Sequence, residues 1–346
     1  MDSTYAGAYG HVKALYLNLL KKDEIDRIKE TKKDEFMNVL SSTSYKNEID
    51  QFYNRFKEPD IIDIIVNTHF LNNCNSAMGV LPSIGKPLIR SYLSKIDIQN
   101  IKLILAAKLI GKNVEMTENI LTIGRSFPLG LSSPLISKEE YRNIIEQKDI
   151  VEVINYLTRY PYGRVLLPFS VSAELSRDVS GMSLALDIEY YNDLLRNFKF
   201  YNGNEGPVLR FIQGLIDLRN IITVIKEIEL KKPAKELLIK GGSISTDKLN
   251  DMTKMNIEDF IKDLPYDLND ALQLYKQDGL IANFEVELKR IVHDKYLPIF
   301  RANSLSIAST LSFIISAEIE RDTIRLSWFK KYYNIEKKVV DIGYGI

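Results

Sequence analysis

Apolar side chains recur at every third or fourth position along most of this chain. The recurrence is clear near the start, around residue 100 and around residue 218, at Val12, Leu15, Leu19, Ile98, Ile101, Leu105, Ile212, Leu215, Leu218, Ile222 and Ile225. Such spacing gathers apolar side chains on one face of an α-helix. Glycine and proline interrupt the runs at 128–134, 161–163, 202–207, 241–242 and Pro265. No sustained alternation with a period of two is present, so the pattern predicts an all-α protein.

One segment of the chain is repeated. Residues 87–101 align without a gap with residues 207–221, and a weaker third copy spans residues 310–324. In the third copy Glu320 takes the place of the aspartate and Thr323 the place of the asparagine. The residues that coincide in the first two copies include Pro87 with Pro207, Arg90 with Arg210, Asp97 with Asp217, and Asn100 with Asn220.

The similarity extends upstream of each copy. A further acidic residue precedes each one, and a charged block opens each unit near Lys22, Lys138 and Lys248. We therefore interpret the chain as a triplicate of similar helical domains. The domains are predicted at 1–125, which includes a leading helix from about Tyr5 to Leu20, at 126–238 and at 239–346.

The repeated acid and its neighbour share a helix face, because three positions separate them. The flanking apolar positions would bury that face, and a buried carboxylate costs several kcal/mol unless it has partners. Arg90 and Arg210 lie two turns before their acids, and Arg325 follows Glu320, so these arginines are candidate partners. Three interpretations are open: a polar cross-link between helices inside each domain, three related acids facing a ligand or partner around a pseudo-threefold axis, or a metal site. The metal site has the least support because no histidine or cysteine joins the acids.

Charge and motifs exclude several classes of protein. The chain has 46 basic and 46 acidic residues, and this balance disfavours a general nucleic-acid binder. The segment 79–87 resembles a phosphate-binding loop, but five residues separate its glycines and Pro87 stands where a serine or threonine is needed. We predict no catalytic residue, no cofactor and no metal site. The single cysteine allows no internal disulfide and favours a reducing compartment.

No membrane or export segment is expected. The start of the sequence lacks the basic and apolar regions of a secretory signal. The uncharged stretch 302–317 is shorter than the roughly 20 residues of a membrane-spanning helix. If this protein works at a membrane, another protein must hold it there.

The residues resemble a known family. The lead Tyr5-Ala-Gly-Ala-Tyr9-Gly-His-Val12-Lys-Ala-Leu15 is similar to the start of the C subunit of archaeal and bacterial V/A-type ATPases, which is related to the d subunit of eukaryotic V-ATPases. The three acid-containing helices and the segment 317–325 resemble the family's repeated helices. The family usually has asparagine where Thr323 stands and a glycine-containing end to this helix, whereas Trp328-Phe-Lys-Lys-Tyr follows here.

The resemblance implies a funnel of three similar domains in a pseudo-threefold arrangement. It implies a non-catalytic rotor component that links the D and F subunits of the central stalk to the proteolipid ring and transmits torque between ion flow and ATP chemistry. Its place would be the cytoplasmic face of the membrane, without direct anchoring. Two alternatives are a helical-repeat adaptor for other partners, which would form a solenoid, and a helical-bundle enzyme that holds a metal through its acids.

Overall fold

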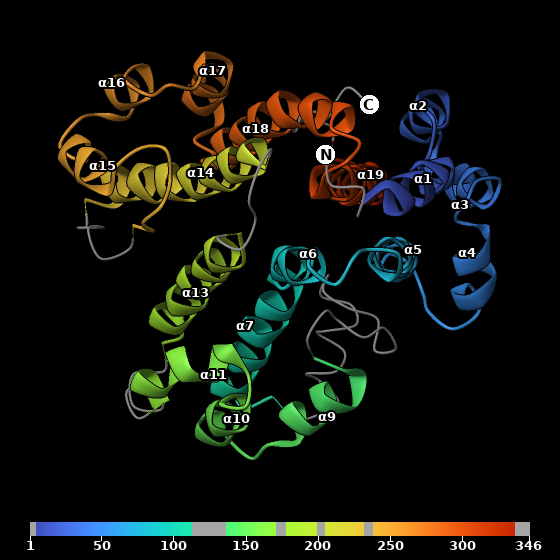
Figure 1. Cartoon of the computed structure of the whole chain (residues 1–346), viewed down its shortest axis with the longest axis horizontal. Coiled ribbons are helices and arrows are strands. Elements are labelled where there is room, and N and C mark those ends of the chain that lie inside the picture. The colour runs from blue at the N-terminus through green and yellow to red at the C-terminus, as the bar shows by residue number, and fades with distance from the viewer. Residues whose placement is uncertain (1–4, 113–135, 171–177, 199–204, 232–237, 336–346) are drawn as a thin grey trace. The chain divides into compact units, whose positions relative to one another are not determined.

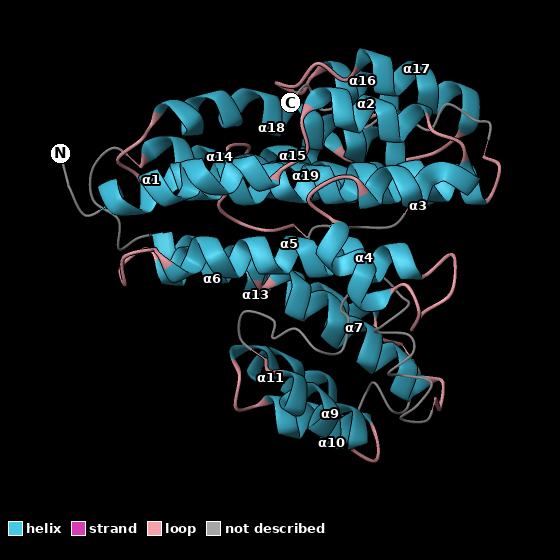
Figure 2. Ribbon diagram, turned by 90° about the vertical axis from the view of Figure 1, so that its right-hand side faces the viewer, coloured by secondary structure: helices cyan, strands magenta, loops and turns pink. Residues whose placement is uncertain are grey.

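The protein folds as helices joined by loops, as Figures 1 and 2 show. The computed structural model describes residues 5–112, 136–170, 178–198, 205–231 and 238–335. Within these ranges every regular element is an α-helix or a short 3₁₀ helix. The predicted all-α fold is therefore confirmed.

After the leading helix α1 (Ala6–Leu15) and a 3₁₀ turn (Tyr16–Asn18), the described helices follow one order three times: three short helices and then two long stretches. The first run comprises α2 (Lys22–Glu30), α3 (Lys33–Ser41), α4 (Lys46–Phe52), α5 (Ile61–Gly79) and the pair α6 (Lys86–Leu93) and α7 (Lys95–Leu109). The second comprises α9 (Lys138–Glu146), α10 (Ile150–Leu157), α11 (Pro161–Leu166) with a 3₁₀ turn (Leu167–Phe169), α13 (Ser180–Phe198) and α14 (Gly206–Leu230). The third comprises α15 (Thr246–Met252), α16 (Ile257–Lys262), α17 (Asn269–Asp278), α18 (Ala282–Ala302) and α19 (Ile307–Tyr332).

The first helix of each run begins at a defined hydrogen bond. The Ser137 hydroxyl accepts from the Glu140 N–H at 3.3 Å, and the Glu140 carboxylate accepts from the Ser137 N–H at 3.1 Å, which together form a capping box. The Ser245 hydroxyl accepts from the Lys248 N–H at 3.2 Å at the start of α15. At α2 the Glu24 carboxylate accepts from the N–H of residue 21 at 2.8 Å. These bonds satisfy N–H groups that a helix start otherwise leaves open.

The described residues divide into two compact units: those of 5–197 with 313–335, and those of 198–312. In the first unit, apolar side chains of α2 to α5 form a core that also contains Ile324 and Trp328 of α19. The Trp328 ring is fully buried at 5.1 Å from the Phe36 ring, and its Nε1–H donates to the Pro59 carbonyl at 3.1 Å. The last described helix thus completes the core of the first run.

The second unit has its own core, formed by α14 together with α15 to α18. Helices α14 and α18 pack closely at Gly214. A Cβ on this residue would lie 3.3 Å from a methyl group of Val292. In both units, the second long helix of one run packs on the next run along the chain. Helix α7 packs on the second run and α14 on the third, whereas α19, the second long helix of the third run, packs on the first run. The borders of the compact units therefore do not follow the borders of the sequence repeats.

Candidate functional site

The repeated acids lie in the contacts that join one run to the next, and we call each such set of contacts a joint. Asp97 on α7, Asp217 on α14 and Glu320 on α19 are each at most 1% exposed. Each carboxylate accepts a hydrogen bond from a tyrosine hydroxyl of the following run, the third run being followed by the first. The pairs are Tyr141 with Asp97 at 2.7 Å, Tyr266 with Asp217 at 2.9 Å, and Tyr45 with Glu320 at 2.7 Å.

Two of the acids also accept a backbone hydrogen bond at a matching place. The N–H of Leu20, two residues before α2, donates to Glu320 at 2.5 Å. The N–H of Ile244, two residues before α15, donates to Asp217 at 3.1 Å. The Ser243 hydroxyl donates to Asp217 as well. Each of these carboxylates therefore fixes the point at which the next run begins.

The environment of these acids favours their neutral form. Burial raises the pKa of Glu320 to about 7, although the hydrogen bonds from Tyr45 and Leu20 oppose the shift. Burial likewise raises the pKa of Asp217 against the bonds from Ser243, Ile244 and Tyr266. Burial and the adjacent Glu320 carboxylate raise the pKa of the Tyr45 hydroxyl, which stays protonated and able to donate. Neutral donors therefore hold both carboxyl groups.

The arginines expected beside the acids lie elsewhere. Arg90 and Arg210 are exposed, whereas the acids are buried. Arg325 donates from Nε to Asp63 on α5 at 2.5 Å, with the Asp63 side chain 2% exposed. Hydroxyl and backbone donors bind the carboxylates of Asp217 and Glu320, so a cation beside these two acids is not required.

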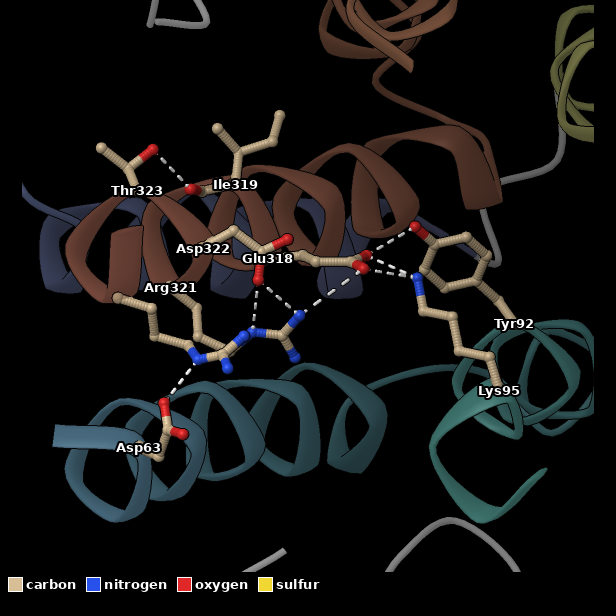
Figure 3. Close-up of polar contacts among 9 residues, drawn as sticks. Asp63, Tyr92, Lys95, Glu318, Ile319, Arg321, Asp322 and Thr323 are labelled. Atoms are coloured by element: carbon tan, nitrogen blue, oxygen red, sulfur yellow. Dashed lines mark hydrogen bonds and ion pairs between the residues drawn. The ribbon is translucent and has the colours of Figure 1, made fainter. Parts of the chain in front are cut away.

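The residues three positions after the acids differ from one another in their contacts. The Asn220 amide forms two hydrogen bonds with the backbone of Ile239, one as donor and one as acceptor, both at 2.8 Å. Thr323 donates to the Ile319 carbonyl of its own helix at 2.8 Å, as Figure 3 shows. Asn100 is 1% exposed on α7. In the second copy, therefore, this position cross-links two segments, whereas in the third copy its hydroxyl bonds within one helix.

Two of the three joints have a second polar contact, five residues after the acid. Here Arg325 pairs with Asp63, and Lys102 on α7 pairs with Asp187 on α13 at 2.5 Å. Both pairs connect the second long helix of one run to the first long helix of the next. At the equivalent position α14 carries Ile222, which belongs to the core of the second unit.

A third level lies eleven residues after the acid. Lys108 donates to the carbonyls of Ile145 and Gln147 at 2.5 Å each, where α9 ends. Lys331 donates to the Lys29 carbonyl, where α2 ends. A cation at a helix C-terminus satisfies open carbonyls and complements the helix dipole. Burial lowers the pKa of both lysines.

The third joint contains a further ion pair, at an aligned position that carries opposite charges. Lys95 and Glu318 stand two positions before the acids of the first and third copies. Lys95 donates to Glu318 at 2.6 and 2.7 Å and the Tyr92 hydroxyl donates to it at 2.8 Å, as Figure 3 shows. Next to this pair, the guanidinium of Arg321 donates to Asp322 at 2.8 Å (Figure 3). The same guanidinium lies over the Phe70 ring.

Tyr45 itself is held by a buried pair. The His69 ring lies 4.0 Å from the Tyr45 ring, and its Nδ1 is 3.3 Å from a Glu48 oxygen. Burial opposes ionisation of Glu48, but the hydrogen bond and charge of His69 outweigh it and lower the Glu48 pKa. The arrangement fixes the hydroxyl that reaches Glu320.

The site is thus a set of polar contacts between helices. Within the described ranges, no group of three or more His, Cys, Asp or Glu side chains is placed to hold a metal ion. Among the same residues, no helix has the combination of length and apolar character that a bilayer crossing requires. The chemistry of the joints is hydrogen bonding and ion pairing between packed helices.

Comparison with known proteins gives matches over nearly the whole chain. A family model described as "ATP synthase (C/AC39) subunit" matches residues 8–341. The C subunit of the A-type ATP synthase of Thermoplasma volcanium is 34% identical over 98% of this chain and 98% of its own length. The protein of the same name from Thermoplasma acidophilum is 30% identical over 99% and 98%. That of Methanocaldococcus jannaschii is 23% identical over 89% and 77%.

Proposed function

Because the chain belongs to the ATP synthase (C/AC39) subunit family, we propose that it is the non-catalytic component that couples the central stalk of a V/A-type ATP synthase or ATPase to the membrane sector. In this role it binds the D and F subunits of the stalk on one side and the proteolipid ring on the other. It transmits torque between ion transport and the ATP chemistry of other subunits. The observation that carries the proposal is the family match over residues 8–341.

The joints support a mechanical role. A part that transmits torque must not yield between its helices, and each joint ties a long helix to the next run by buried contacts. Removing one partner of a buried polar contact leaves the other unsatisfied, at a cost of about 1–3 kcal/mol, or more for a charge. The contacts therefore resist the sliding of one run against another.

The threefold design is part of the proposal. We propose that the copies at 1–125, 126–238 and 239–346 are related domains, arranged as a funnel about a pseudo-threefold axis. The hydrogen bond between acid and tyrosine, which recurs in all three joints, supports this relation between the copies. We also propose that the protein lies at the cytoplasmic face, bound peripherally through the ring.

A binding experiment tests the proposal. The full chain is immobilised and offered the purified D–F pair and, separately, the detergent-solubilised proteolipid ring. We expect saturable binding of each, and simultaneous binding of both. Excess soluble chain serves as a competitor and should displace them. Failure of both partners to bind would overturn the coupling role and would favour the helical-repeat adaptor.

A further inference from the structure

The third joint brings several titratable side chains together inside the first unit. Glu320 on α19 and Tyr45, which immediately precedes α4, meet at its centre, and both are buried. Charges on each element packed around them act on this contact. The groups are Glu24 on α2, Glu48 on α4, His69 on α5 and Arg321 on α19 itself.

The carboxyl group of Glu320 is surrounded by neutral donors. Its two oxygens accept from the Tyr45 hydroxyl and from the Leu20 N–H, and no described residue places a cation against it. Ionisation therefore puts a charge in a buried site without a counterion, which is costly. Burial raises the pKa of Glu320 to about 7, and the Glu24 carboxylate adds to this effect. Near neutral pH, ionisation thus favours an arrangement in which water reaches the carboxylate.

The segment best able to give water this access is the link between α1 and α2, residues 16–21. The link donates the Leu20 N–H to Glu320, and its Leu17 side chain is 83% exposed. Segments with few buried contacts open at a lower free energy than a core does. Helix α19, by contrast, is held on the first run by Trp328, which is fully buried in the core. The link can therefore detach while α19 stays in place.

His69 can change its charge without losing its contact in this cluster. Its Nδ1 is 3.3 Å from a Glu48 oxygen, whereas its Nε2 is buried and has no hydrogen-bond partner among the described residues. A proton can leave Nε2 while the contact at Nδ1 is kept. Histidine is the side chain that ordinarily changes its charge between pH 5 and 8. A positive charge on His69 opposes the effect of burial on the pKa of Glu320, so the two groups are coupled.

We propose that the third joint is a pH-sensitive latch, in which ionisation of Glu320 releases the link 16–21 from α19 and the charge on His69 sets the pH of release. The latch is closed on the acidic side of neutrality, where the carboxyl group is protonated. The rest of the first unit stays folded when the latch opens. The inference goes beyond the coupling role and does not depend on it.

Hydrogen exchange of the full chain, followed amide by amide by NMR, tests the latch. The Leu20 N–H reports opening of the link, because it donates to Glu320. The Ile25 N–H donates to the Lys21 carbonyl at 3.0 Å in the first turn of α2, and it reports opening of the run as a whole. Each exchange rate is divided by that of the same amide in an unstructured peptide at the same pH, which gives an opening constant.

We expect the Leu20 N–H to open more often than the Ile25 N–H at every pH. Its opening constant should rise about tenfold between pH 6 and pH 8, because the pKa of Glu320 is about 7 in the closed joint and 4.5 in water. Glu320→Gln should remove the rise. His69→Gln should move it to higher pH, whereas His11→Gln, at an exposed position, should leave it unchanged.

A Leu20 opening constant in the wild type that is the same at pH 6 and pH 8 would overturn the latch. Equal opening constants for Leu20 and Ile25 would overturn it as well, since the link would then open only when the run unfolds. A rise that persists in Glu320→Gln would remove Glu320 as its cause. A rise at the wild-type pH in His69→Gln would refute the part given to His69.

Discussion

The carboxylate of Glu320, on the last described helix, accepts a hydrogen bond at 2.7 Å from the hydroxyl of Tyr45, which lies 275 positions earlier. The contact joins the third repeat to the first. Its counterparts, Tyr141 with Asp97 and Tyr266 with Asp217, join the first repeat to the second and the second to the third. The same kind of hydrogen bond thus occurs once between each run of helices and the run on which its second long helix packs.

Replacing Tyr45 with phenylalanine should destabilise the first unit. The substitution keeps the ring but removes the donor to Glu320, so we expect a loss of about 1–3 kcal/mol in the free energy of unfolding. Urea unfolding of the full chain measures it. Tyr53→Phe, at a 57% exposed position, is the control and should change little. A Tyr45→Phe protein as stable as the control would mean that this contact does not hold the joint.

The pH dependence of stability should carry the signature of Glu320. Burial raises its pKa to about 7 from an ordinary value of 4.5, so the folded state holds a proton that the unfolded state releases. Its stabilising contribution is complete below pH 4.5 and is lost as the pH rises through about 7. Glu320→Gln mimics the protonated group. As the pH rises from 4.5 to about 7, the variant should therefore become more stable than the wild type, by up to about 3 kcal/mol in the free energy of unfolding.

Unfolding at pH 5, 6, 7 and 8 checks that expectation. Glu258→Gln is the control, because the Lys276 and Lys262 side chains hold the Glu258 pKa at about 2, outside this range. Parallel profiles for the wild type and Glu320→Gln would contradict the assignment.

The ion pairs Arg325–Asp63 and Lys102–Asp187 should contribute differently to the free energy of unfolding. Arg325→Ala leaves the Asp63 carboxylate, whose side chain is 2% exposed, without its partner, and should cost about 3–5 kcal/mol. Lys102→Ala affects a pair whose side chains are 25% and 22% exposed, and should cost about 1 kcal/mol. Double-mutant cycles with Asp63→Asn and Asp187→Asn separate the pair energies. Equal coupling energies for the two pairs would refute this ranking.

Gly242 should tolerate no side chain. A Cβ at this residue would lie 2.2 Å from the Asp217 carboxylate, which is fixed by Ser243, Ile244 and Tyr266. We expect Gly242→Ala to destabilise the second unit by about 1–3 kcal/mol, as overpacking does. Gly10→Ala is the control, because a Cβ there meets nothing within 4 Å and alanine favours α1. A Gly242→Ala chain as stable as this control would show that the loop moves freely.

The sequence predicted the helices and the burial of the repeated acids, because periodicity and the aligned segment report both. It did not reveal the partners of the acids. The tyrosines come from the following copy and from different places in it: Tyr141 lies on the first short helix, whereas Tyr45 and Tyr266 follow the second. No fixed spacing therefore marks them.

In the first copy α6 ends at Leu93 and α7 begins at Lys95, so the spacing between Arg90 and Asp97 does not set a common face. In the second copy α14 runs unbroken through Arg210 and Asp217, yet Arg210 is exposed and Asp217 is buried. The ion pair between Lys95 and Glu318 could have been predicted from the sequence, since these opposite charges stand at one aligned position. It becomes visible only once the third copy is known to pack on the first.

The coupling role is tested most directly by ion transport in the reconstituted complex. ATP hydrolysis and ATP-driven ion uptake are measured in vesicles that contain the complex with and without this chain. We predict that hydrolysis persists without the chain, that ion uptake is lost, and that adding the purified chain restores uptake. Ion uptake at the full rate in the absence of the chain would contradict the account.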